Sequence, residues 1–327
     1  MSLLLAAHLL CVNVGAGGPI VAAWLDWRAL RGSDIAARAA VYLARAAVVG
    51  LVLGAVLGVL VGWLKWLPEY QSLWLGPLSY KMKWAIVEAV FSLVIVLGWA
   101  WFLPGRADGK KVGAVVRSIF AVLAATNLLY HFPMLFSVAA QLHDAGQTTG
   151  VPINGRQFRA LISKETIALG LHVSLASVAV TGAMLLILAQ RKLARGDTAN
   201  AEVIARWGGR WALLPSLLQL PLGLYMLSIL PPGEQARLMG GSGLSVLLFV
   251  GALAAAFWLM NDLAQISMGE VTRGLLTRAV VAMVVTVSLM TGMQLQTREP
   301  GAGRGSAERA EVWPRMNADD TDFLNRR

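Results

Sequence analysis

Long runs of apolar residues recur along this chain, and short polar segments separate them. Eight runs approach the roughly 20 residues that an α-helix needs to cross a bilayer. They span residues 3–25, 39–63, 84–103, 119–142, 167–190, 211–230, 244–260 and 279–295, and the seventh has the least distinct ends. The pattern predicts an all-α fold, a polytopic bundle of about eight transmembrane helices.

The apolar runs divide the chain into a membrane domain and a terminal segment. We assign residues 1–296 to a transmembrane helical domain, with four helices in residues 1–142 and four in residues 163–296. Residues 297–327 are charged, rich in glycine and poor in large apolar side chains, a composition that cannot bury a core. We expect this segment to be a tail on the outer side of the membrane, mobile or held by a partner.

The composition excludes a soluble globular protein. Hydrophobic residues make up 57% of the 327 residues, charged residues make up only 14%, and the mean hydropathy is +0.63. About a quarter of the residues of a soluble domain are charged. The net charge of +10 could indicate nucleic-acid binding, but the basic residues lie in short segments between apolar runs. Positive loops on the cytoplasmic side explain this distribution better, so we expect membrane lipid and no nucleic acid as a partner.

The start of the chain and its cysteine content narrow the class further. Apolar residues begin at Leu3 without a preceding basic segment, so the first run predicts a retained helix and not a cleaved signal peptide. Cys11 is the one cysteine, which excludes a disulfide within the chain and the paired-cysteine motifs of metal and c-type haem sites.

The basic residues predict the orientation in the membrane. The segments after runs one, three, five and seven hold 14 lysines and arginines, and those after runs two, four and six hold 7. This bias places the first group in the cytoplasm and both termini outside. We therefore predict a multi-pass protein of the bacterial inner membrane. Residues 64–80 are rich in Trp and Tyr, which predicts that they lie along the outer membrane surface.

The four histidines, His8, His131, His143 and His172, all fall in the outer half of the bundle or at its outer rim in this orientation. His172 lies roughly 8 Å and His131 roughly 16 Å from the outer helix ends, at 1.5 Å per residue. An imidazole within a membrane helix is a candidate functional group. Imidazoles at similar depth on different helices are what haem b ligation in a bundle needs.

Each histidine also has a structural interpretation. His8 and His172 could donate a hydrogen bond to a carbonyl across a helix interface. His131 precedes Pro133 closely, and a kinked helix offers free backbone partners. His143 stands beside Asp144 at a helix end, where a solvated imidazole is the simplest interpretation.

Glu88 is the one acidic side chain well inside an apolar run, and it too lies in the outer half. A carboxylate there must be protonated or paired. We regard it as a candidate catalytic residue, for a proton path or a haem site. The alternative is an interhelical hydrogen bond.

Three passages resemble subunit I of the cytochrome bd-type quinol oxidases. They are HLLCVNVGAGGP at residues 8–19, EAVFSLVIVLGW at residues 88–99 and HVSLASVAVTGAM at residues 172–184. Gly54, Gly58 and Gly62 of the second helix agree with the family in their spacing of small residues. The resemblance implies that His8 ligates a high-spin haem, that His172 ligates a low-spin haem, and that Glu88 has a haem-site or proton role.

The chain also departs from that family. A second helix-three glutamate of the family falls at about Tyr80, the outer quinol loop is reduced to residues 231–243, and the methionine segment of the low-spin haem has no counterpart. Four residues of the outer half are candidates for the missing axial ligand: Met226, Met290, Met293 and His131.

The leading hypothesis is a haem b-binding membrane subunit of a respiratory electron-transfer complex, part of a quinol-linked oxidoreductase. It would bind one or two b-type haems and a quinone, and pass electrons to an outer-face partner, a periplasmic cytochrome c, another redox protein or a second membrane subunit. A complete O₂-reducing oxidase subunit is the second hypothesis, and a haem-free structural anchor is the third. A transporter is weaker, because charged residues near the bilayer middle are almost absent.

Overall fold

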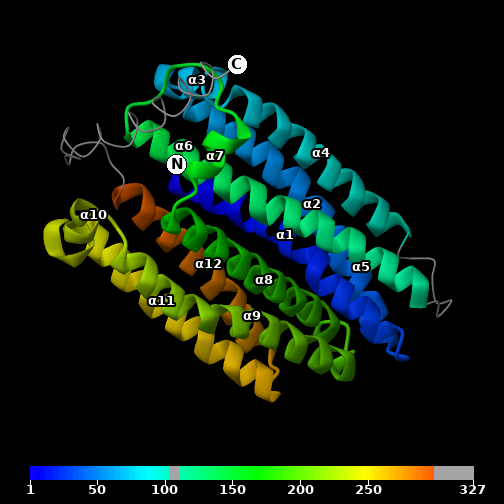
Figure 1. The fold of residues 1–327 in the computed structure, drawn as a ribbon. Coiled ribbons are helices and arrows are strands. Elements are labelled where there is room, and N and C mark those ends of the chain that lie inside the picture. Colours follow the sequence, from blue (N-terminus) through cyan, green and yellow to red (C-terminus); the bar gives the residue numbers. More distant parts are fainter. Residues whose placement is uncertain (103–110, 298–327) are drawn as a thin grey trace.

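The computed structural model describes residues 1–102 and 111–297, which form a bundle of long helices that run along a common direction (Figure 1). The long helices are α1 (Ser2–Ala29), α2 (Asp34–Leu64), α4 (Ser79–Phe102), α8 (Lys164–Leu193), α9 (Thr198–Ser228), α11 (Gly243–Met268) and α12 (Arg273–Thr297). One further span consists of α5 (Lys111–Thr126), the π-helix η2 (Asn127–His131) and α6 (Phe132–Asp144). Eight of the described helices are long and apolar enough to cross a membrane, so the predicted all-α multi-pass fold is confirmed.

Most helices extend past the apolar runs that predicted them. The sixth begins at Thr198 and not at residue 211, because Arg206 and Arg210 lie on α9 and interrupt its hydropathy. The seventh has 26 residues. Its predicted end at residue 260 was too early, because the polar residues that follow include a buried carboxylate, Asp262, that is ion-paired and therefore tolerated in the helix.

Four short elements lie between the long helices: α3 (Pro68–Leu75), α7 (Gly155–Ala160), α10 (Pro232–Ala236) and the π-helix η3 (Arg237–Gly241). The helix α3 falls within the aromatic segment that the sequence places along the outer surface. Asn154 begins α7 with a capping box, since its side chain accepts from the backbone of Gln157 and the Gln157 side chain accepts from the Asn154 backbone. Neither α3 nor α7 was predicted, because each helix is too short to show a helical period in its apolar residues.

The helices α1 and α8 lie at the centre of the bundle, each at the start of a four-helix half (Figure 1). The largest group of buried residues joins both halves, and it includes Leu25, Leu43, Leu185, Leu186 and Leu276. Many of the remaining buried residues are alanines and glycines, and these small side chains let the backbones approach closely, as they do in other membrane bundles.

The contact between α1 and α2 shows this close approach. A Cβ added at Gly50 would lie 2.6 Å from the carbonyl oxygen of Cys11, and one at Gly54 would lie 2.6 Å from the Val12 side chain. At Gly62 an added Cβ would meet nothing within 4 Å. The glycines noted in the sequence of α2 therefore serve to pack this helix on α1 everywhere except near its outer end.

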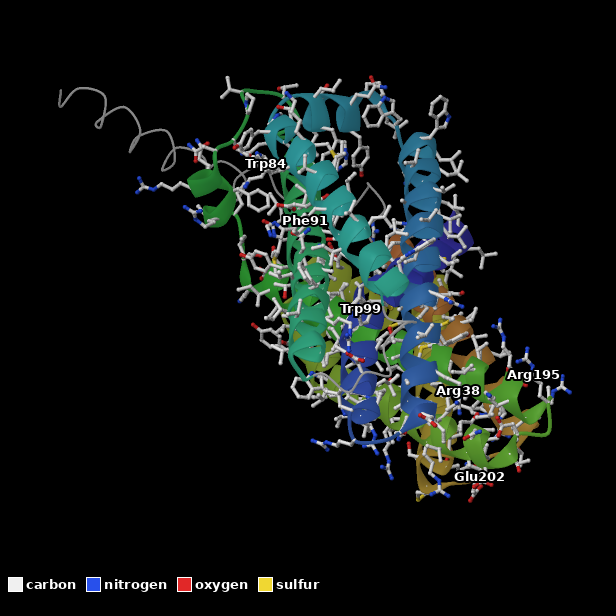
Figure 2. The ribbon with its side chains drawn as sticks, turned by 90° about the vertical axis from the view of Figure 1, so that its right-hand side faces the viewer. Arg38, Trp84, Phe91, Trp99, Arg195 and Glu202 are labelled. Carbon is white, nitrogen blue, oxygen red and sulfur yellow. The ribbon has the colours of Figure 1, made fainter. Side chains whose placement is uncertain are left out.

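Two bidentate ion pairs join helices near the opposite end of the bundle, which is the cytoplasmic end in the orientation predicted from the sequence. The guanidinium of Arg117 donates to Asp26 with N–O distances of 2.8 and 3.0 Å, which links α5 to α1. The guanidinium of Arg278 donates to the buried Asp262 with distances of 2.8 and 2.7 Å, which links α12 to α11. Figure 2 shows Trp84 of α4 near one end of the molecule and Arg38, Arg195 and Glu202 near the other.

Candidate functional site

The helices α1 and α8 run parallel and in a fixed register. Ser177 Oγ donates to Asn13 Oδ1 at 2.8 Å, and a Cβ added at Gly17 would lie 2.7 Å from Thr181 Oγ1. Both pairs are separated by 164 positions in the sequence, and His8 and His172 have the same separation. The two histidines therefore lie at the same level of the bundle, about 7 Å from the Asn13–Ser177 pair at 1.5 Å per residue.

His8 rests against the glycine face of α2. Its Nδ1 lies 2.8 Å from the carbonyl oxygen of Gly54, and a Cβ added at Gly58 would lie 2.8 Å from its Cε1. A carbonyl oxygen can only accept, so Nδ1 carries the proton and donates. In this neutral tautomer Nε2 has its lone pair available and makes no hydrogen bond with any described residue, which is the arrangement that a metal-ligating histidine has when its other nitrogen is held by a carbonyl.

His172 holds a nitrogen without a partner. Its Nδ1 is buried and forms no hydrogen bond with any described residue. The residue meets α9 through its backbone instead, since Gln219 donates to the His172 carbonyl at 3.3 Å. A buried polar atom without a partner costs about 1–3 kcal/mol, and in native proteins it is explained by strain, a functional role, or a bound water or ion; Trp99 Nε1 is a second such atom among the described residues.

Glu88 and His131 form a pair between α4 and the π-helix η2. Glu88 Oε2 lies 3.2 Å from His131 Nδ1, and their side chains are 21% and 45% exposed. Asn127 fixes the same junction, because its amide donates to the Glu88 carbonyl at 2.8 Å and to Ser92 Oγ at 2.9 Å. The sequence predicted each residue separately as a candidate but did not predict that they meet.

The π-helix accounts for the position of His131. It ends one residue before Phe132, and Pro133 follows, which has no N–H to donate and disfavours a regular helix before it. In place of a regular α-helix, residues 127–131 form a π-helical turn, a feature that is frequent at functional sites. It aims the imidazole at α4.

The Glu88–His131 pair lies deeper than the other two histidines. The ion pair between Arg117 and Asp26 sets the antiparallel register of α5 against α1. His131 lies fourteen residues after Arg117, so it lies at the level of Val12, fourteen residues before Asp26 on α1. Val12 is four residues from His8 on α1, so His131 lies about 6 Å farther than His8 from the outer ends of the helices. The site has two levels, an outer one with His8 and His172 and an inner one with Glu88, His131 and the Asn13–Ser177 pair.

The candidate axial methionines differ in depth. Gln190 of α8 donates to Thr277 of α12 at 3.1 Å, and this antiparallel register places Met293 within about 3 Å of the level of His172 and Met290 somewhat deeper. Met226 lies about 10 Å farther out on α9, counted from the Gln219 contact with His172. No described contact joins any of the three sulfurs to His172. Depth therefore favours Met293.

His143 is less solvated than the sequence suggested. Its ring stacks on Tyr70 with centroids 4.5 Å apart, and its Nε2 lies 3.3 Å from Glu69 Oε2. It connects the outer end of α6 to α3. Its position at the rim, away from the other histidines, agrees with a role in holding the outer surface together.

Several polar residues of this region were not singled out in the sequence: Asn13, Ser92, Asn127, Ser177 and Gln219. Their common signal is an amide or hydroxyl inside an apolar run, the kind of residue that bridges membrane helices. The groups His, Cys, Asp and Glu do not gather in threes anywhere among residues 1–102 and 111–297 in a way that could hold a metal ion. A haem iron needs fewer protein ligands, so this finding bears on bare metal ions only.

An open groove of about 450 Å³ lies at the outer end of α4. It is lined by Ser79, Tyr80, Lys83 and residues 152–155. The groove thus combines a phenol, an ammonium group and an amide, all of which can donate hydrogen bonds.

No protein-family profile matches the sequence, and no curated protein matches it either. Among solved structures, the chain is similar to that of bd oxidase from Geobacillus thermodenitrificans, with 15% sequence identity and a TM-score of 0.74. The similarity covers 95% of this chain and 88% of the other. The resemblance predicted from three short passages is confirmed at the level of the fold: this chain is a multi-pass membrane protein with the helical bundle of bd oxidase.

Proposed function

We propose that this chain is a haem b-binding subunit of a respiratory electron-transfer complex in the bacterial inner membrane. The observation that carries the proposal is the buried Nδ1 of His172, which has no hydrogen-bond partner among the described residues and lies at the same level of the bundle as His8. Two neutral imidazoles with available nitrogens inside apolar helices are the donor set that b-type haems use.

The residues present fit a haem as ligands. His8 offers Nε2 while Gly54 holds its Nδ1, and His172 offers an imidazole that makes no hydrogen bond to any described residue. Met293 is the favoured candidate for a second ligand at the level of His172. A bound haem would supply one-electron transfer, and the surrounding apolar side chains would exclude water and help to set the reduction potential of the haem.

Glu88 and His131 are the proposed proton-holding pair. A carboxylate and an imidazole 3.2 Å apart can share or exchange one proton, and the Asn127 amide keeps α4 at that distance through the Glu88 carbonyl. The Glu88–His131 pair lies about 6 Å deeper in the bundle than the proposed haem ligands, and a proton bound there can balance the negative charge of an electron that reaches the haem.

The proposed electron donor or acceptor is a quinone, and the outer groove beside Tyr80 and Lys83 supports this choice. A quinone carbonyl needs a hydrogen-bond donor, and its apolar ring and tail need a lipid-accessible surface, which the start of α4 offers. Other membrane subunits and an outer-face redox protein are the proposed partners. A cytochrome c as that protein remains a prediction from the sequence.

One observation favours the haem-free structural subunit as the second candidate. His8 already has a protein partner and fits a notch left by Gly58, so it would be stable in the bundle without iron. The O₂-reducing oxidase is a third candidate that rests on the fold of the bd oxidase structure.

A pyridine haemochrome assay of the purified full chain tests the proposal. We expect b-type haem, and we expect His172→Ala to lower the haem content by half or more while His143→Ala leaves it unchanged. Absence of haem b from folded protein would contradict the proposal and favour the structural subunit. Haem that binds CO and turns over O₂ would favour the oxidase instead.

A further inference from the structure

Arg45 is the one charged residue between positions 39 and 64 of α2, and its side chain is exposed on the outside of the bundle. No carboxylate of residues 1–102 or 111–297 lies within ion-pair distance of it. An arginine inside an apolar membrane helix needs a counter-charge or access to the interface.

A groove of about 470 Å³ lies beside this side chain, between α2 and the last turns of α4. It is lined by Arg45, Val48, Val49, Leu97, Ala100 and Trp101. Five of these six side chains are apolar, and the guanidinium is the one charged group. The groove therefore has an apolar lining and a single positive group, the guanidinium of Arg45.

The exposed Trp101 indicates that this groove lies near a membrane interface. Trp101 lines the groove near the end of the described part of α4, and α2 continues for 11 residues beyond Arg45, to Asp34. Trp101 is 84% exposed, and exposed tryptophans favour the headgroup level of a bilayer. Arg38, near the inner end of α2, lies well beyond Trp99 in Figure 2. The groove thus opens where lipid headgroups meet acyl chains.

We infer that this groove binds an anionic phospholipid of the cytoplasmic leaflet. The guanidinium of Arg45 would hold the phosphate through paired N–H donors, Trp101 would lie at the headgroup level, and Val48, Val49 and Leu97 would line an acyl chain. Basic pockets between membrane helices on the cytoplasmic side recognise anionic headgroups in this way. The inference does not depend on haem binding.

Native mass spectrometry of the full chain in a neutral detergent tests this inference, with equal amounts of dioleoyl phosphatidylglycerol and dioleoyl phosphatidylcholine. We expect the wild-type chain to retain the anionic lipid about five-fold better, since one arginine near the surface contributes about 1 kcal/mol. Arg45→Gln should bring the ratio of the two lipids to about one. Arg38→Gln, a matched loss of charge two turns away on α2, should keep the wild-type ratio. Inorganic phosphate should not displace the lipid, because it has no chain for the groove.

Three outcomes would overturn the inference: equal retention of the two lipids by the wild type, an unchanged ratio in Arg45→Gln, or displacement of the anionic lipid by inorganic phosphate. Asp108 lies outside the described residues and is the rival counter-charge. If the wild type shows no preference and Asp108→Asn creates one, the carboxylate holds Arg45 and the lipid does not. Arg45→Lys keeps the charge and should retain part of the preference, which tests the inference even if Arg45→Gln fails to fold.

Discussion

At the scale of single residues, the candidate site consists of polar groups whose partners differ in kind. His8 has a carbonyl partner, His131 has a carboxylate partner and His172 has none among the described residues. In an apolar helix each arrangement has a different consequence. A satisfied imidazole stabilises the bundle, a paired one can hold a proton, and an unpartnered one lowers stability until a ligand arrives.

The Glu88–His131 pair should contribute measurable coupling between α4 and η2. We expect a double-mutant cycle of Glu88→Gln and His131→Gln to give a coupling energy of about 0.6 kcal/mol and at most about 1.7 kcal/mol, the range for polar pairs between membrane helices. Unfolding in mixed micelles measures it. Glu88→Gln combined with His143→Gln is the control and should be additive, since His143 pairs with α3. Additivity in both cycles would show that the pair contributes nothing.

At the scale of helices, the glycine face of α2 determines how closely α1 can pack. We expect Gly50→Val to destabilise the protein by about 1–3 kcal/mol, because the new Cβ would lie 2.6 Å from the Cys11 carbonyl oxygen and the helices must separate.

Gly62→Val is the matched control, because the same substitution on the same helix meets open space. It should change stability by less than about 0.5 kcal/mol. Thermal unfolding of both variants in one detergent gives the comparison. Equal losses for the two variants would mean that helix propensity, and not packing on α1, sets the effect.

The sequence predicted the long helices but not their pairing, and the reason is physical. A hydropathy pattern identifies the segments that are stable inside a membrane, and it identified eight spans because each is apolar over its length. Contacts such as Glu88 with His131 depend on a π-bulge and on which helices are neighbours, neither of which a hydropathy pattern contains. The shared depth of His8 and His172 was predictable from topology. The missing partner of His172 was not, because it requires knowing what surrounds the ring.

At the scale of the whole molecule, the bundle has one orientation to test. We expect Thr149→Cys, between α6 and α7, to react with an impermeant maleimide in intact cells, and Ala194→Cys, beside Arg195 at the opposite end in Figure 2, to react only after permeabilisation. The background should carry Cys11→Ala, which removes the one native thiol. The reverse labelling pattern would invert the orientation and move the Arg45 groove to the outer leaflet.

The parallel register of α1 and α8 has an electrical consequence. If His8 and His172 each hold a haem, as proposed above, the two haems would lie at similar depth, and an electron that moves between them would travel in the plane of the bilayer and cross almost none of the transmembrane voltage. Work against that voltage is about 2.3 kcal/mol per charge for each 100 mV crossed. This step would therefore be insensitive to membrane energisation, and any voltage dependence of turnover would come from protons that reach Glu88 along the bilayer normal.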